Sequence, residues 1–149
     1  MSVASLGSPG REVCVLAHDI RPSPGDPQLC RDVVDALNSR GVRARVALPG
    51  NAAEAKAVIA GSELCVSARM HACVAALSSG VPYVGVEYLD KFSGQFAWYG
   101  DLGVVVPQTR ALDVGLIAER AKDVRVRAGS AGHVDVSDIG WLPLLEQGG

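Results

Sequence analysis

The sequence predicts a doubly wound α/β domain, in which a parallel sheet of about five strands carries helices on both faces. Three observations favour this class. Short apolar runs, typical of buried parallel strands, alternate with segments of helical periodicity. The connections between them are short and rich in glycine, proline and asparagine. The chain has 149 residues, of which 48% are hydrophobic and 20% charged, as expected for one globular domain.

The first predicted strand is the apolar run 13–17, and an amphipathic helix follows it. Asp26 and Pro27 provide an N-cap and a first-turn proline for that helix. Gly41 occupies the C′ position, where a positive φ ends many helices. The helix is expected to bury one apolar face, made of Leu29, Cys30, Val33, Val34 and Leu37.

The same strand–helix pattern then repeats. A second strand is predicted over 44–48, and Asn51 with Glu54 resembles a capping box that opens a helix running to about Gly61. The remaining predicted elements are, in order, a strand over 64–67, a helix over 70–78 closed by Gly80, a strand over 83–87, a short helix over 93–99, a strand over 104–106 and a helix over 112–123. This alternation indicates a Rossmann-like parallel sheet.

One domain is expected, with a less regular segment on each side. Residues 1–11, rich in serine and glycine, are predicted to be a flexible leader, and residues 12–127 the α/β domain. Residues 128–149 are predicted to be a mostly irregular tail, in which the stretch 141–145 is apolar enough to dock on another surface.

Composition argues against several classes of function. The 14 basic and 16 acidic side chains give a net charge of −2, without the basic excess of a protein that binds nucleic acid or anionic membranes. No apolar run approaches the roughly 18 residues that a bilayer span requires. The first ten residues lack the basic and apolar segments of a secretory signal. We therefore expect a cytoplasmic protein.

The motifs of several common enzyme and metal sites are absent from the sequence. It contains no Gly-x-Gly-x-x-Gly fingerprint, no P-loop and no Gly-x-Ser-x-Gly elbow. The 3 histidines lack a His-x-x-x-His spacing, so no histidine-based metal site is predicted. No Cys-x-x-Cys pair occurs, and we expect the cysteines to be reduced, without a disulfide framework or zinc: Cys14, Cys30, Cys65 and Cys73.

Polar side chains gather where predicted strands end. Strand by strand they are His18 and Asp19, then Ser67, Arg69 and His71, then Glu87, Tyr88 and Lys91. Ligands of doubly wound sheets bind at the carboxyl ends of the strands. The sequence therefore predicts a binding site along this edge.

The segment 67–71 gives the sharpest signal, because a buried strand passes directly into a helix there. Free backbone N–H groups and the positive end of the helix dipole favour an anion at such a point. Arg69 adds a planar fork for a carboxylate or phosphate, and His71 lies in the first helical turn. The alternative is structural: Arg69 pairs with Glu87 or Asp90, and His71 caps its own helix.

Aromatic residues are concentrated between residues 83 and 99: Tyr83, Tyr88, Phe92, Phe96, Trp98 and Tyr99. Aromatics at helical spacing more often form core or interface than a ligand cage. Lys91 lies in the same segment and is a candidate second cation, with a solvated loop lysine as the alternative.

A combined pattern runs through residues 61–94. An apolar strand leads into Ser67-x-Arg69-x-His71, a helix of small residues, Gly80-Val81-Pro82, a further strand and Tyr88-x-x-Lys91-x-x-Gly94. This pattern resembles the signature of the polysaccharide pyruvyl transferase family. The combination is fairly specific, whereas Gly-Val-Pro alone recurs in many glycosyltransferase-like folds.

The resemblance implies a transferase that moves a pyruvyl group from phosphoenolpyruvate to a sugar of a cell-surface polysaccharide, as a cyclic ketal. The acceptor would be a saccharide, free or lipid-linked, and no metal or organic cofactor is needed. The family's association of Arg-x-His with phosphoenolpyruvate transfers to Arg69 and His71, and we hypothesise that His71 is a general acid or base. The expected substrate-binding residues are Ser67, Arg69, His71, Tyr88, Lys91 and His18.

Family members resemble two-lobed glycosyltransferase folds, and this chain matches only the C-terminal lobe. A second lobe or a second copy of the chain is then expected to supply the acceptor side. Two alternatives remain open. One is the nucleotide-sugar-binding lobe of a glycosyltransferase, in which Glu87 would bind a ribose. The other is a non-catalytic module that binds anions or a partner.

Overall fold

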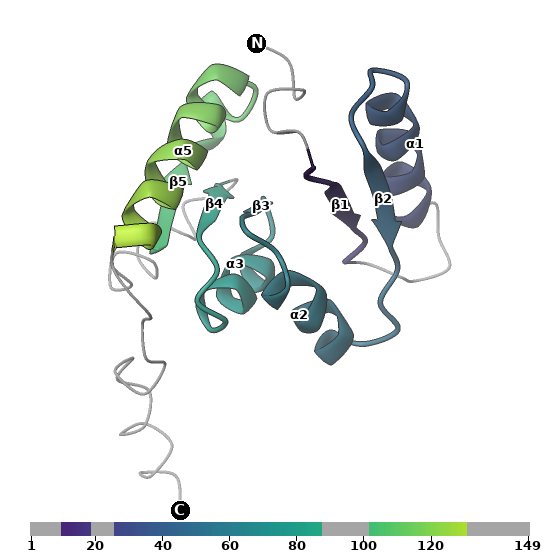
Figure 1. Cartoon of the computed structure of the whole chain (residues 1–149), viewed down its shortest axis with the longest axis horizontal. Helices are drawn as coiled ribbons and strands as arrows, with labels where there is room; N and C mark the ends of the chain where they lie inside the picture. The colour runs from purple at the N-terminus through teal and green to yellow at the C-terminus, as the bar shows by residue number, and fades with distance from the viewer. Residues whose placement is uncertain (1–9, 19–25, 88–101, 131–149) are drawn as a thin grey trace, which may run out of the picture. The chain divides into compact units, whose positions relative to one another are not determined.

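The computed structural model describes residues 10–18, 26–87 and 102–130 (Figure 1). The chain divides into two compact units, Met1–Val58 and Ile59–Gly149. In the described residues, the first unit contains a two-stranded sheet and the second a three-stranded sheet. Parallel strands alternate with helices in both units, so the predicted α/β class is confirmed.

The first unit is a strand–helix–strand unit. β1 (Val13–Leu16) pairs in parallel with β2 (Ala44–Ala47), and α1 (Asp26–Asn38) packs against both strands. The register places each residue of β1 directly beside its counterpart in β2. A helical crossover of this kind is what allows two consecutive strands to run in the same direction.

The buried face of α1 is narrower than the sequence predicts. Cys30, Val34 and Leu37 are buried, whereas Leu29 is 63% exposed and Val33 is 39% exposed. Each of these two exposed residues comes one position before a buried residue. Its side chain therefore points about 100° away from that of the buried residue around the helix axis. A sheet of two strands covers a single stripe of the helix, and the adjacent apolar stripe stays exposed.

Local chemistry ends α1 as predicted. Gly41 has a φ of +77°, and its N–H donates to the carbonyl of Asn38 at 2.9 Å. The N–H of Val42 donates to the carbonyl of Leu37 at 3.0 Å. These two bonds form a Schellman ending, which satisfies carbonyls that a helix otherwise leaves unpaired.

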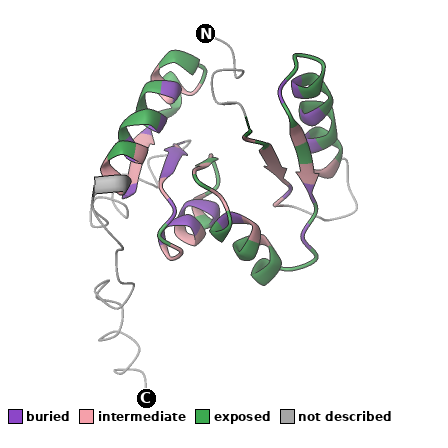
Figure 2. Ribbon diagram, in the orientation of Figure 1, coloured by how far each residue is buried: buried purple, intermediate pink, exposed green. Residues whose placement is uncertain are grey.

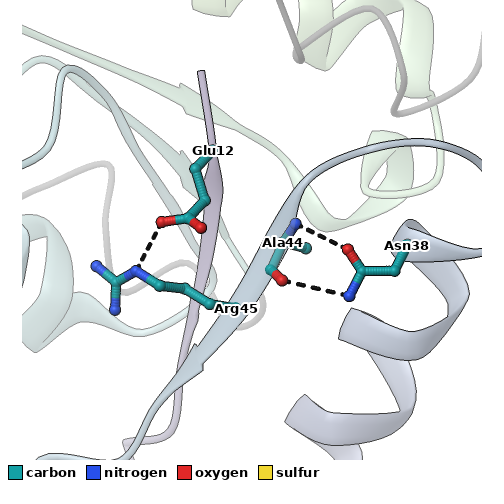
Figure 3. A network of polar contacts seen from close by, with 4 residues as sticks. All are labelled: Glu12, Asn38, Ala44 and Arg45. Carbon is teal, nitrogen blue, oxygen red and sulfur yellow. Dashed lines mark hydrogen bonds and ion pairs between the residues drawn. The ribbon is translucent and has the colours of Figure 1, made fainter. Parts of the chain in front are cut away.

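Side chains also fix the start of β2 (Figure 3). The side-chain oxygen of Asn38 accepts the N–H of Ala44 at 3.0 Å, and its amide nitrogen donates to the Ala44 carbonyl at 3.3 Å. Arg45 donates to the carboxylate of Glu12 at 2.8 Å, next to β1. This ion pair is exposed and contributes little to stability. The two hydrogen bonds of Asn38 therefore do more to fix where β2 begins.

α2 (Ala52–Ala60) begins at the predicted capping box. The side-chain oxygen of Asn51 accepts the N–H of Glu54 at 2.9 Å. The carboxylate of Glu54 accepts from the side-chain amide of Asn51 and from the N–H of Gly50, both at 2.7 Å. The bond from the Glu54 N–H satisfies a donor that the helix start leaves unpaired, and the bond from Gly50 ties the residue before the cap to the first turn, so the predicted start is confirmed.

In the second unit, β4 (Tyr83–Val86) lies between β3 (Cys65–Ser67) and β5 (Gly103–Val106). All three strands are parallel. α3 (Met70–Leu77) packs against β3 and β4, and α5 (Val114–Ser130) packs against β4 and β5. β4 is therefore the central strand of this unit, and Figure 2 shows it as largely buried.

α3 packs through mostly small side chains, and its buried residues are Ala72, Cys73, Ala76 and Leu77. Gly80, at a φ of +69°, ends it as predicted. The N–H of Val81 donates to the carbonyl of Ala76 at 2.9 Å, so the ending repeats that of α1.

The last helix is longer than the predicted span 112–123. A short 3-10 helix, η3 (Gln108–Arg110), precedes α5, and Asp113 sets the start of α5 by accepting the N–H of Leu116 at 2.8 Å. Ala118, Ala121 and Val124 form a buried stripe that continues beyond the predicted end. The helix therefore extends into the first residues of the predicted tail.

Other predictions lie outside the described residues. These are most of the leader 1–11, the short helix 93–99 and the tail from residue 131 onward. Among the helices that the structure describes, none has the length and apolarity required to span a bilayer.

Two thiols lie where α3 packs on β3. Burial raises the pKa of Cys73 to about 12 and that of Cys65 to about 11. Cys73 Sγ donates to the carbonyl of Ser67 at 3.8 Å, and Cys65 Sγ donates to that of Ala72 at 4.0 Å. All four cysteines are free. Cys73 is fully buried and serves as a core residue, as predicted.

These raised pKa values predict a loss of stability at alkaline pH. The ordinary value is 9.0, so above about pH 9 the unfolded chain loses thiol protons that the folded chain retains. Below that pH the contribution is constant. Above it, the free energy of unfolding should fall by up to about 1.4 kcal/mol per pH unit for each thiol. Urea unfolding between about pH 8 and pH 11 measures this slope.

Cys73→Ala provides the comparison for the alkaline slope. The variant leaves a cavity and should be less stable at every pH. Its stability should nevertheless decline less steeply above pH 9, because one shifted thiol is gone. Parallel profiles for the variant and the unmodified chain would show that the Cys73 thiol does not cause the decline.

A second prediction concerns the close contact between β4 and β5. Gly103 pairs with Tyr83, and a Cβ atom at Gly103 would overlap the buried Tyr83 ring. Gly103→Ala should therefore lower the free energy of unfolding by about 1–3 kcal/mol, measured by urea titration. In the control Gly115→Ala, the new Cβ lies 3.4 Å from the nearest atom, and the variant should be neutral or more stable. Equal effects of the two changes would contradict this account.

Candidate functional site

The candidate site is the connection between β3 and α3. Ser67 ends the strand, and Met70 begins the helix. Arg69 is the N-cap residue, with an extended backbone at φ −100° and ψ 121°, and its side chain makes no capping hydrogen bond. Arginine is uncommon at this position, because N-caps are usually short side chains with an oxygen acceptor.

Hydrogen bonds within the connection fix its backbone. Ser67 Oγ accepts the N–H of Arg69 at 3.0 Å. The carbonyl of Arg69 accepts the N–H groups of Ala72 at 3.1 Å and Cys73 at 3.3 Å, which are the first bonds of α3. The strand therefore passes into the helix through two residues only, Ala68 and Arg69.

The electrostatics of the connection favour an anion. The first turn of α3 contains no acidic residue that would neutralise the positive end of the helix dipole and so compete with a bound anion. Arg69 and His71 are both exposed. The connection thus offers a guanidinium, an imidazole and the first helical N–H groups within a few residues of one another in the sequence, which is the chemistry of a phosphate or carboxylate site.

The structural alternative for His71 is not observed. His71 lies in the first turn of α3, but the described residues provide no hydrogen bond or ion pair for its imidazole. The predicted capping of its own helix is therefore absent from this part of the chain.

Glu87 follows the neighbouring strand at the same edge. The register pairs Ser67 with Gly85, so Arg69 and Glu87 each come two residues beyond a paired position. The N–H of Glu87 donates to the carbonyl of Val106 at 2.8 Å, and the residue is only 7% exposed. Among the described residues, Glu87 is the one charged residue in the buried set. Its burial had no signal in the sequence beyond the apolar strand that precedes it.

The segment between η3 and α5 contains a charged pair with a structural role. Arg110 donates to Asp113 Oδ2 at 2.6 Å. The N–H of Leu116, and then the Arg110 guanidinium, hold the pKa of Asp113 below its ordinary value. This carboxylate stabilises the start of α5, so we do not include it in the candidate site.

His18 lies in the first unit, at the end of β1. Its backbone N–H donates to Asp26 Oδ2 at 3.2 Å, and this bond joins the end of the strand to the start of α1. Ser67, Arg69 and His71 belong to the second unit. The predicted binding residues Tyr88 and Lys91 lie outside the described residues, as do Asp19 and Asp90.

No site for a metal ion is formed by the described side chains. No group of three or more histidine, cysteine, aspartate or glutamate residues has a suitable arrangement in this part of the chain. The donors at the β3–α3 connection are a guanidinium, an imidazole and backbone N–H groups, which suit an anion.

The comparisons with known proteins bear directly on this site. The family model for polysaccharide pyruvyl transferase matches residues 4–90, more than half of the chain. The matched range includes Ser67, Arg69, His71 and Tyr88, and it ends one residue before Lys91. A search of curated proteins gave no match. The resemblance in the sequence is thus confirmed by the family match, and the chain belongs to the polysaccharide pyruvyl transferase family.

Proposed function

We propose that the β3–α3 connection binds phosphoenolpyruvate, and that the chain acts in transfer of its pyruvyl group to a saccharide of a cell-surface polysaccharide. The observation that carries the proposal is the exposed Arg69 at the N-cap of α3, directly before the first helical N–H groups. Membership of the polysaccharide pyruvyl transferase family supports it.

The donor matches the charges of the connection. Phosphoenolpyruvate carries a phosphate and a carboxylate, both of which accept bidentate hydrogen bonds from a guanidinium. In the proposed complex, Arg69 binds one of these groups, and the N–H groups at the start of α3 bind the same group or the other. Lys91 and Tyr88 extend the site, and His18 is a further proposed substrate-binding residue.

His71 is the proposed general acid–base group. In the proposed reaction, a sugar oxygen forms a bond to C2 of phosphoenolpyruvate while C3 gains a proton to become a methyl group. A second sugar oxygen then replaces phosphate at C2, and the electron pair of the broken C–O bond leaves with phosphate. The two hydroxyl protons balance the proton gained by C3 and the one carried by phosphate. In this proposal the imidazole of His71, an exposed residue, transfers the first of these protons.

Phosphoenolpyruvate binding is the first test. Calorimetric titration of the chain should show binding that Arg69→Ala weakens by at least about tenfold, because charge-assisted bonds contribute about 1.5–3 kcal/mol. Arg120→Ala is the matched control, since Arg120 is exposed in α5 and lies 3.9 Å from Asp123. Its effect should be less than about twofold.

The same titration decides between the alternatives. UDP binding without phosphoenolpyruvate binding would replace the proposal with a nucleotide-sugar-binding lobe. Phosphoenolpyruvate binding that Arg69→Ala leaves unchanged would place the donor elsewhere on the chain. Binding without turnover under any acceptor, including when a second lobe is supplied, would favour a non-catalytic module.

His71→Gln tests the acid–base role. The variant should bind phosphoenolpyruvate within about threefold of the unmodified chain, while phosphate release in the presence of methyl glycoside acceptors falls by about 100-fold or more. His133→Gln, which changes a histidine that has no role in the proposal, is the control and should leave phosphate release unchanged. Undiminished phosphate release by His71→Gln would exclude His71 from proton transfer.

A further inference from the structure

Ser67 accepts two hydrogen bonds, one at its side-chain hydroxyl and one at its backbone carbonyl. Its Oγ accepts the N–H of Arg69 at 3.0 Å, and its carbonyl accepts the thiol of Cys73 at 3.8 Å. Cys73 lies fully buried within α3. The buried Cys73 of α3 therefore holds the Ser67 carbonyl, and the Ser67 hydroxyl in turn holds the backbone of Arg69, the residue before the helix.

The conformation of Arg69 depends on this arrangement. A serine oxygen that accepts the N–H two residues later sets the local turn, in competition with helix formation. Arg69 accordingly keeps an extended backbone, and α3 begins one residue later. The backbone conformation from which the Arg69 side chain extends is thus set by the bond that the Arg69 N–H donates to Ser67 Oγ. The sequence predicts that the Ser67 side chain contacts the substrate directly.

We propose that Ser67 is a positioning residue for the phosphoenolpyruvate site, which acts on the donor through Arg69. This inference rests on the proposed function. The thiol of Cys73 holds the Ser67 carbonyl against α3. A direct contact between Ser67 and the donor is the competing role, and the two roles differ in how Ser67 and Arg69 should couple.

A double-mutant cycle measures that coupling. Ser67→Ala should weaken phosphoenolpyruvate binding by about two- to tenfold, as expected for the loss of one hydrogen bond. In the Arg69→Ala background the same change should cost less than about twofold, because its effect passes through Arg69. Ser67→Thr, which keeps the hydroxyl, should bind as the unmodified chain does.

Ser78→Ala is the matched control. Ser78 Oγ donates to the carbonyl of Ala75 at 3.2 Å, so the same chemical change is made just beyond the other end of α3. It should leave phosphoenolpyruvate binding unchanged. A Ser67→Ala effect that is equally large with and without Arg69 would overturn the positioning role and show that Ser67 acts independently.

Amide hydrogen exchange of Arg69 tests the structural step without a ligand. Exchange of the Arg69 N–H should accelerate in Ser67→Ala and stay slow in Ser67→Thr and Ser78→Ala. Unchanged exchange in Ser67→Ala would overturn the inference even if phosphoenolpyruvate binds. Accelerated exchange together with no phosphoenolpyruvate binding by the unmodified chain would instead show that the proposed function fails.

Discussion

The parallel pairing of β3 with β4 determines the layout of the second unit. It places Ser67 beside Gly85. The segments that follow the two strands therefore leave the sheet at the same edge, with Arg69 and Glu87 in equivalent positions. The same pairing sets Cys65 and Ser67 against α3, where thiol donors join strand and helix. One register thus defines both the core of this unit and the polar edge where Arg69 and His71 follow β3.

Features that depend on local chemistry were predictable from the sequence. Gly41 and Gly80 end their helices because the left-handed backbone there suits glycine, and the pair Asn51–Glu54 caps α2 through bonds that span three residues. Features that depend on neighbouring elements were not. The exposure of Leu29 and Val33 reflects how much of α1 a two-stranded sheet covers, and the extent of α5 reflects a buried stripe that continues past residue 123.

The candidate site shows the same division. A strand passing directly into a helix at Ser67 and Arg69 is visible in the sequence, and so is the placement of His71 in the first turn. The burial of Glu87 and the bond from Cys73 to Ser67 required the folded structure, because they join residues of different elements. The site therefore combines a motif that the sequence reveals with supporting contacts that only packing reveals, among them the hydrogen bond from Cys73 to Ser67.

The central claim is that the start of α3 binds the donor. Backbone amide shifts during titration with phosphoenolpyruvate test it most directly, because each N–H reports its own surroundings without any substitution. The largest shifts should fall on residues 69–72, with small shifts in α5 and in the strands of the first unit. Saturable shifts centred anywhere else, or none at all at millimolar donor, would contradict the claim that this helix N-terminus is the donor site.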